Sequence, residues 1–404
     1  MFVGGAAYAV LSHIFREPAH LPALKAALGE LPNDEDSKEE GDWAAGKAIA
    51  SQITDLWDAG EINARIDDKP PTAYYTTKYR KHARDPLNDN QGFYGAAWAG
   101  QTASVTLPPE LQKPVSPLGL ANADLEAAFT PLKNPPPEES DRFLNAARQV
   151  KVLGRLPAQP ELGPQGVQLT VGTFWAYDGA PGLGTPPRLY NQLIREVLAL
   201  QNYSAADWAR FLALCNLAMA NASIIAWRGK YEHAIARPVL WLREFKGDLQ
   251  DDKWEPMGSP RSTRPAPTMV EAVPPRESGQ VLLAGSRDEQ KFTPDFPAYP
   301  SGHATFGGAV FEVLRLILDR INLEPDGKPV SLHSDELDEL TTDPFTKKPR
   351  PGHPVRFRTT EDLIDANACS RVALGVHWAF DSEDGVAAGR IVGQRVFDKL
   401  YKLN

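Results

Sequence analysis

Hydrophobic residues recur at helical spacing over much of the chain, with polar residues between them. No long window shows the strict alternation of apolar and polar residues that is typical of a half-buried strand. The pattern predicts helices over residues 2–31, 43–57, 139–152, 167–176, 187–200, 205–225, 304–321, 361–374 and 384–400, and a further helical stretch from Trp227 through Arg243. The fold is therefore predicted to be mainly α, with room for short strands in the loops.

Three long segments, residues 60–138, 246–297 and 324–354, follow neither period and are rich in proline, glycine and polar residues. The chain has 36 prolines among 404 residues, which is nearly twice the usual share of about 5%. Irregular segments of this length inside a compact protein usually form or cover a functional site. We therefore expect long proline-rich loops at the entrance of any site that the helices carry.

The charge balance limits the partners of the chain. Lys and Arg number 43 and Asp and Glu 52, which gives a net charge of −9 and argues against a general binder of nucleic acids or anionic membranes. The two cysteines, Cys215 and Cys369, have no zinc-site spacing and are expected to be buried thiols.

The start of the chain gives no sign of a membrane anchor. The apolar run at residues 2–11 is shorter than the roughly 20 residues that span a bilayer, so neither a membrane span nor a signal peptide is expected. The run opens abruptly in what looks like the middle of a helix, which predicts a missing upstream segment. The compartment stays open: the cytoplasm is the default expectation, and secretion follows if a leader precedes this start.

Candidate chemistry is concentrated in three separated segments, and the first carries two cations. Lys230 and Arg237 are seven residues apart, so on one continuous helix they would lie within about 20° of each other, two turns apart. Both could then face the same pocket. Arg237 offers a fork of donors that suits a tetrahedral oxyanion, and Lys230 adds a compact charge.

The second segment, Pro300–His303, immediately precedes a predicted helix. Its backbone N–H groups and the positive end of that helix should therefore point at the same anion. Gly302 allows a close approach of the backbone, and the hydroxyl of Ser301 can donate a further hydrogen bond. His303 is placed to exchange a proton with a bound ligand.

The third segment contains Ser370 and Arg371, followed by His377 and Asp381. Gly375 is expected to break the helix, so that Arg371 ends one element and His377 begins the next. His377 and Asp381 are four residues apart, and the carboxylate could orient the imidazole and raise its basicity. A simple surface ion pair of Asp381 is the alternative.

Together these segments resemble the signature Lys-X6-Arg-Pro, Pro-Ser-Gly-His and Ser-Arg-X5-His-X3-Asp, and all eleven specified positions match. Vanadium-dependent haloperoxidases share this signature with the type 2 phosphatidic acid phosphatase superfamily. The sequence at 174–179, 184–188, 296–299 and 375–378 is similar to the fungal chloroperoxidase branch and its soluble bacterial relatives. The resemblance is clear from about Phe174 to Asp381 and faint before residue 150.

The resemblance implies a helical-bundle architecture of the vanadium haloperoxidase and acid phosphatase type. It divides the chain into an N-terminal helical part, residues 1–170, which contains an irregular proline-rich segment and too few helices for a complete first bundle, and a catalytic bundle, residues 171–404. The early helices could need a partner chain to cover their apolar faces, so a homo-oligomer is one expected state.

The resemblance also implies a role for each matched residue. His377 would be the axial vanadium ligand and His303 the acid–base group. Asp178 would pair with Arg371, and Lys230 would polarise the bound peroxide. The equatorial oxygens of vanadate, or of phosphate in its place, would be held by Lys230, Arg237, Arg371, Ser301 and the amide of Gly302.

Three further residues, Trp227, Phe296 and His233, keep two interpretations each, and His353 has one. Trp227 and Phe296 match aromatic positions of family members that oxidise chloride, where they would dry a halide pocket, although either could equally be core packing. His233 is expected to be structural, with a contact behind the site as the alternative, and His353 to be solvated.

The expected activity is the oxidation of bromide, and of chloride, by hydrogen peroxide to hypohalous acid, with small-molecule partners that include an organic acceptor. The alternative is a soluble acid phosphatase that uses the same pocket and a phosphohistidine, because vanadate mimics the transition state of phosphoryl transfer. A degenerate oxyanion-binding protein without turnover is the third hypothesis, and its expected mark would be the loss of a signature residue.

Overall fold

The structure is a computed structural model that describes residues 120–155, 165–177, 184–245, 247–257, 293–294, 296–342, 349 and 352–401. The helices expected at 2–31 and 43–57 lie outside the described residues, as do most of the loops at 60–138 and 246–297. The division at residue 170 therefore stays a prediction.

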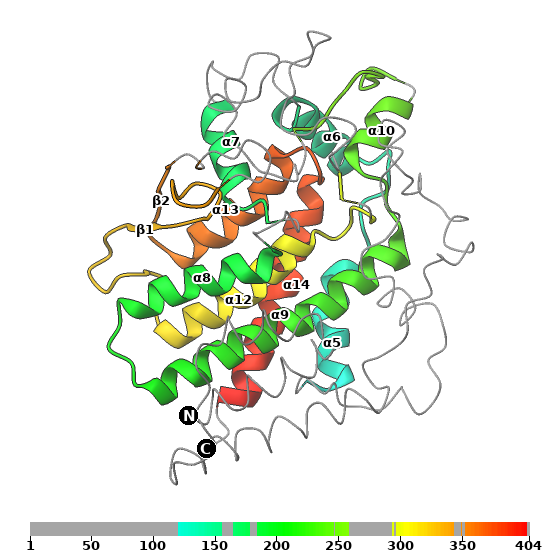
Figure 1. Ribbon diagram of the computed structural model, residues 1–404. Coiled ribbons are helices and arrows are strands. Elements are labelled where there is room, and N and C mark those ends of the chain that lie inside the picture. Colours follow the sequence, from blue (N-terminus) through cyan, green and yellow to red (C-terminus); the bar gives the residue numbers. More distant parts are fainter. Residues whose placement is uncertain are drawn as a thin grey trace, which may run out of the picture. The chain divides into compact units, whose positions relative to one another are not determined.

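The described part of the chain is mainly helical, as predicted (Figure 1). Its helices are α5 (Asn122–Phe129), α6 (Asp141–Leu153), α7 (Gln165–Phe174), α8 (Pro186–Ala199), α9 (Ala205–His233), α10 (Pro238–Glu244), α12 (Gly302–Leu318), α13 (Thr360–Ala373) and α14 (Ala379–Val396). A 3-10 turn, η3 (Thr130–Leu132), and a π turn, η4 (Phe397–Tyr401), complete the helical elements. Strands β1 (Val330–Leu332) and β2 (Val355–Phe357) pair antiparallel, with Val330 opposite Phe357.

Most helices begin where local sequence chemistry predicts. The side chains of Ser140, Ser204 and Thr359 accept backbone N–H groups at the starts of α6, α9 and α13, which satisfies otherwise unpaired donors. The irregular pattern of residues 60–138 gave no sign of α5. This helix has only eight residues, too few to show a clear period, and it is packed against α9 and α14.

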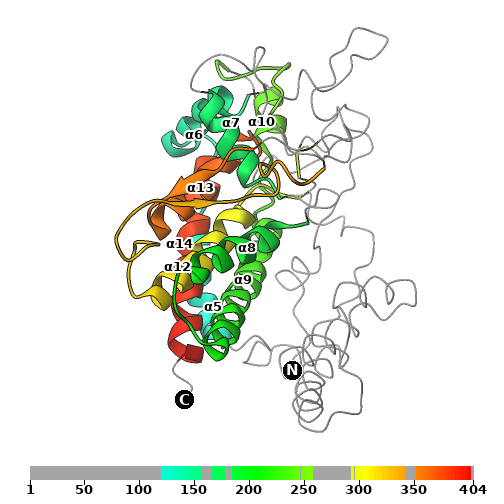
Figure 2. The same cartoon turned by 60° about the vertical axis from the view of Figure 1, so that its left-hand side comes forward.

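Helices α12 and α14 form the centre of the bundle, and α9, α13 and α8 also pack on α12 (Figures 1 and 2). The two central helices approach closely because small residues face each other: a Cβ added at Gly389 would lie only 2.2 Å from the carbonyl oxygen of Thr305. At the upper end of this pair, the amide of Ser301 donates to the carbonyl of Asp381 at 2.9 Å. The packing therefore places the start of α12 beside the start of α14.

A cluster of buried aromatic rings lies behind the start of α14. The ring of Trp378 is 4.8 Å from that of Phe143 on α6 and 5.7 Å from that of Trp241 on α10. Its indole N–H donates to the carbonyl of Ala236 at 3.0 Å. Because Ala236 and Trp378 are the neighbours of Arg237 and His377, the cluster fixes the backbone from which both of these side chains project.

One described helix is long and apolar enough to cross a membrane by length and composition alone. It is the stretch Ala205–Lys230 of α9, and half of its most apolar window is buried inside the protein. Buried residues such as Leu214, Ala218 and Ala222 belong to the main hydrophobic core. The position of α9 in the bundle therefore accounts for its apolar composition.

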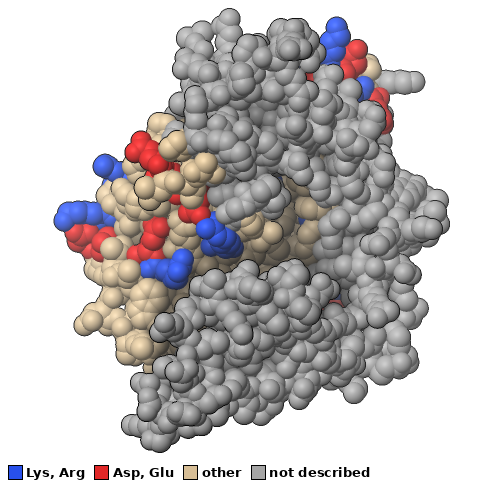
Figure 3. All heavy atoms as spheres, viewed as in Figure 1, with Lys and Arg blue, Asp and Glu red and all other residues tan. Residues whose placement is uncertain are grey.

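The surface is mixed in charge. On the face in Figure 3, acidic and basic side chains are interspersed over the described residues. Ion pairs such as Arg142–Asp384 at 2.6 Å and Arg155–Asp251 at 2.5 Å join neighbouring segments.

Of the two cysteines, Cys215 is buried as expected, whereas the expectation for Cys369 is wrong because it lies on an exposed face of α13.

Candidate oxyanion site

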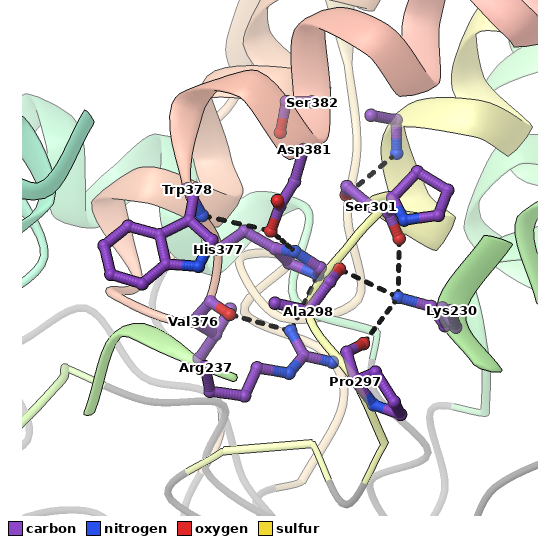
Figure 4. Close-up of polar contacts among 12 residues, drawn as sticks. Lys230, Arg237, Pro297, Ala298, Ser301, Val376, His377, Trp378, Asp381 and Ser382 are labelled. Atoms are coloured by element: carbon purple, nitrogen blue, oxygen red, sulfur yellow. Dashed lines mark hydrogen bonds and ion pairs between the residues drawn. The ribbon is translucent and has the colours of Figure 1, made fainter. Parts of the chain in front are cut away.

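Lys230 lies near the end of α9, and its side chain is fully buried. Its ammonium nitrogen donates to three backbone carbonyls, those of Pro297 at 3.0 Å, Ala298 at 3.1 Å and Pro300 at 2.6 Å (Figure 4). Burial, and then the positive charge of Arg237, lower the pKa of Lys230 well below its ordinary value. An ammonium group has three donors, so the segment 297–300 engages all of them.

Arg237 does not continue the helix that carries Lys230. The expected continuous helix is wrong here, because α9 ends at His233, Ala234 adopts the left-handed conformation and Arg237 is the extended N-cap of α10. Proline at 238 disfavours helical geometry for the residue before it. Lys230 and Arg237 nevertheless meet at one segment, since the Nε of Arg237 donates to the carbonyl of Phe296 at 2.9 Å.

The start of α12 presents the Pro300–His303 segment to these cations. Ser301 is the N-cap, and its Oγ accepts the amide of Ala304 at 3.3 Å, which leaves the hydroxyl hydrogen to donate elsewhere. Gly302 and His303 form the first helical positions, and the side chain of His303 is almost fully buried. The positive end of α12 thus lies at the site, as the sequence predicts.

His377 lies in the turn between α13 and α14, and Arg371 lies in the last turn of α13. Gly375 has φ 73° and makes the predicted break between them. The Nδ1 of His377 donates to Oδ2 of Asp381 at 2.7 Å, and the same oxygen accepts the amide of Trp378 at 3.1 Å. The carboxyl group therefore orients the imidazole, in preference to the surface ion pair that was the alternative.

The electrostatics keep the imidazole of His377 neutral. Burial, and then the charges of Arg237 and Lys230, lower its pKa well below the ordinary value. Burial also raises the pKa of Asp381 to about 8. With Nδ1 bonded to Asp381, the Nε2 lone pair accepts from the guanidinium of Arg237 at 2.9 Å (Figure 4). This lone pair is what an imidazole offers to a metal centre.

Trp227 and Phe296 form an aromatic wall beside the cations. Their rings meet edge to face at 4.5 Å, and both side chains are partly buried. The Nζ of Lys230 lies 5.0 Å from the centroid of Phe296 and 5.7 Å from that of Trp227. Both aromatic residues thus flank the site, and neither is confined to the core of the bundle.

The remaining sequence-predicted residues lie elsewhere. Asp178 is outside the described residues, so its expected pairing with Arg371 stays a prediction. His233 has its Nε2 2.7 Å from the carbonyl of Leu132, which supports the structural interpretation. His353 is exposed in its loop, as expected.

The donor set fits a bound oxyanion such as vanadate. Three cationic side chains, Lys230, Arg237 and Arg371, are fully buried around one neutral imidazole, an excess of positive charge that favours an anion. The described residues hold no group of three or more His, Cys, Asp or Glu side chains for a metal cation. A Cβ added at Gly302 would lie 3.9 Å from the nearest side-chain atom, on Phe306, so there is space beside this residue at the start of α12.

The comparisons with known proteins agree with this chemistry. The family model for the VCPO second helical-bundle domain matches residues 210–404, the part that carries nearly all of the site. Residues 210–404 are thus similar to the second helical-bundle domain of vanadium chloroperoxidase. The chain is also 32% identical over 273 residues to the vanadium chloroperoxidase of Curvularia inaequalis. That match covers 61% of this chain and about two fifths of the relative, 41%.

Solved structures of vanadium-dependent enzymes share the fold. A bacterial vanadium-dependent iodoperoxidase superimposes with a TM-score of 0.58 at 19% identity, over 89% of this chain and 69% of the other. An apo-type bacterial vanadium-dependent chloroperoxidase gives 0.55 at 17% identity, over 99% and 82%. At this identity the similarity establishes the architecture of a vanadium haloperoxidase bundle.

In this helical bundle, sequence reasoning missed two buried residues that contact the site. Asn367 on α13 and Tyr190 on α8 both hydrogen-bond the backbone carbonyl of His303. Asn367 lies one helical turn before Arg371, so a polar residue on the buried face of the predicted helix 361–374 was the available signal. Tyr190 gave none, because a tyrosine in an apolar stripe is ordinary core composition.

Proposed function

We propose that the chain is a vanadate-dependent haloperoxidase that oxidises bromide, and chloride, with hydrogen peroxide to hypohalous acid. The observation that carries the proposal is a neutral imidazole, His377, oriented by Asp381 and surrounded by three buried cations. Such a site suits an oxyanion whose central atom accepts a nitrogen ligand.

Each residue has a role in holding vanadate. The Nε2 of His377 would bond the vanadium, and the oxygens would accept from Arg237, Arg371, Ser301 and the amide of Gly302. Bound vanadate supplies a Lewis acid that activates peroxide without a change in its own oxidation state. The buried cations would stabilise the negative charge of bound vanadate in a site that excludes water.

Proton transfer is assigned to His303, because its buried imidazole projects from the first turn of α12 and lies close enough to His377 to contribute to the lowering of its pKa. It would accept a proton from hydrogen peroxide as the latter binds and later return it to the departing oxygen.

Lys230 has a second role besides polarising the oxyanion. Its three donors hold the carbonyls of the segment 297–300, so a bond to vanadate would replace one of these three. Lys230 thus fixes the chain that leads into Ser301 and Gly302.

Trp227 and Phe296 support the assignment of halide as substrate. Aromatic rings beside Lys230 exclude water, which lowers the cost of desolvating chloride or bromide near the reacting oxygen. The organic acceptor would be a small molecule that reacts with hypohalous acid.

A phosphohydrolase is the second candidate, and the His377–Asp381 pair is the observation that favours it. An imidazole with one nitrogen bonded to a carboxyl group and the other facing cations is also suited to attack phosphorus. His303 would then protonate the leaving group.

One assay separates these candidates. Purified apo-protein is supplied with bromide, hydrogen peroxide and a phenol-type indicator dye, with and without orthovanadate, and with phosphate as competitor. Halogenation that requires vanadate and is suppressed by phosphate is the expected result. Hydrolysis of p-nitrophenyl phosphate that vanadate inhibits, without halogenation, would establish the phosphatase instead.

A further inference from the structure

We propose that Asn367, supported by Tyr190, is a positioning residue that sets His303 relative to Arg371. The proposal rests on the function proposed above, in which His303 transfers protons. It concerns the backbone of His303, which is held from two neighbouring helices.

The contacts converge on one carbonyl oxygen. The Nδ2 of Asn367 donates to the carbonyl of His303 at 2.8 Å, and the hydroxyl of Tyr190 lies 3.1 Å from the same oxygen. The hydroxyl of Tyr190 also lies 3.0 Å from Oδ1 of Asn367. Both side chains are fully buried, so water does not compete for these bonds.

The close approach of Asn367 depends on the residue opposite it. A Cβ added at Gly307, one turn after His303 on α12, would lie 2.1 Å from Nδ2 of Asn367. Only a glycine at this position lets the amide reach the carbonyl of His303. The two residues therefore act as a matched pair across the α12–α13 interface.

Asn367 connects His303 to the cation on the neighbouring helix. It lies four residues before Arg371 on α13, and its own carbonyl accepts the hydroxyl of Ser370 at 2.6 Å. Helix α12 packs against α13 and α8, which carry Asn367 and Tyr190 (Figures 1 and 2). The side-chain amide of Asn367 therefore holds the first turn of α12 against α13, the helix that carries Arg371.

The chemistry of the contact requires an amide. Asn367 donates through Nδ2 and offers Oδ1 to the hydroxyl of Tyr190, whereas a carboxylate lacks the donor and leucine lacks both groups. His303 projects its imidazole from the residue whose carbonyl is held. A displacement of this backbone by about 1 Å moves the imidazole equally, and errors of that size can cost about 100-fold in rate.

A double-mutant cycle tests the proposal. Asn367→Leu is expected to lower the kcat of bromination at least tenfold in the wild-type background. In a His303→Ala background the same change should cost less than about twofold, because the group that it positions is already absent. An equal factor in both backgrounds would overturn the proposal, since a general structural defect does not depend on His303.

Two further variants keep the test informative. Tyr190→Phe removes a single hydroxyl and is expected to fold; it should lower kcat about threefold, again only when His303 is present. The matched control is Asn221→Leu on α9, an equally buried amide that donates to the carbonyl of Leu217 in its own helix at 2.8 Å. Its effect on kcat should be the same in both backgrounds.

A readout without turnover separates this proposal from the proposed function. In protein labelled with 15N-histidine, the signals of His303 are those that His303→Ala removes. Asn367→Leu and Tyr190→Phe should shift these signals, whereas Asn221→Leu should leave them in place. Unshifted signals in folded variants would overturn the positioning role. Absence of halogenation by the wild type, with the shifts present, would refute only the proposed function.

Discussion

Lys230→Met is the most informative single perturbation, because Lys230 has two proposed roles: it polarises the oxyanion, and it holds the segment 297–300. Methionine preserves the approximate volume of lysine but removes three hydrogen bonds to the carbonyls of the segment 297–300. Each buried acceptor left without a partner costs about 1–3 kcal/mol. Relief from burying the cation offsets about 1–4 kcal/mol of this sum. At the lower end of both ranges, three acceptors cost about 3 kcal/mol and the offset is about 1 kcal/mol, which leaves a local loss of about 2 kcal/mol in the stability of this segment.

Amide hydrogen exchange measures that loss directly. The amide of Ala298 donates to the carbonyl of Ile235, and that of Ser301 to the carbonyl of Asp381, each at 2.9 Å, so both report on the segment. A loss of about 2 kcal/mol should accelerate their exchange about 30-fold, at a factor of ten per 1.4 kcal/mol.

Lys151→Met is the control for this experiment. The ammonium group of Lys151 donates to the carbonyl of Leu249 at 3.1 Å in another loop, so its loss should leave the amides of Ala298 and Ser301 unchanged. If Lys230→Met leaves their exchange within about twofold of wild type, Lys230 does not hold the segment, and the reasoning from its three donors is refuted.

Three further predictions follow from the same geometry. Gly302→Ala should change the free energy of unfolding by less than about 0.5 kcal/mol, because the nearest side-chain atom lies 3.9 Å from the added methyl group. The same change should weaken orthovanadate binding at least tenfold in a titration of the apo-protein, and an unchanged affinity would place the oxyanion elsewhere. Gly389→Ala should destabilise the protein by about 2 kcal/mol or more in denaturant unfolding, since its Cβ would lie 2.2 Å from a carbonyl oxygen; wild-type stability would contradict the α12–α14 packing. His303→Ala should lower the halogenation rate about 100-fold or more, while the affinity for vanadate stays within about threefold of wild type. A wild-type rate at every pH would show that His303 is not the acid–base group.

The sequence was sufficient to predict most described helices, and amphipathic periods over ten or more residues define α6, α8 and α12 well. It was insufficient for α5, which is shorter than a reliable window and depends on packing against α9 and α14. The exposed position of Cys369 was likewise not predictable, because the sequence does not show which face of α13 points outward.

The signature predicted which site residues come together but misjudged how. Lys230 and Arg237 were placed on one helix from their spacing, whereas the chain breaks before Pro238 and the two cations meet through the carbonyls of residues 296–300. Those carbonyls carry no sequence information, since every residue has one. Contacts of Asn367 and Tyr190 with the backbone of His303 are invisible to motif reasoning for the same reason.

His377 is the proposed ligand of vanadate in a haloperoxidase site. The most direct measurement compares bromination of a phenol-type dye by the wild type and by His377→Ala, each titrated with orthovanadate to saturation at fixed bromide and peroxide. A saturable, vanadate-dependent rate is expected in the wild type, and a loss of nearly all turnover in the folded variant at every vanadate concentration. Equal vanadate-dependent rates in the two proteins would show that His377 is not the ligand.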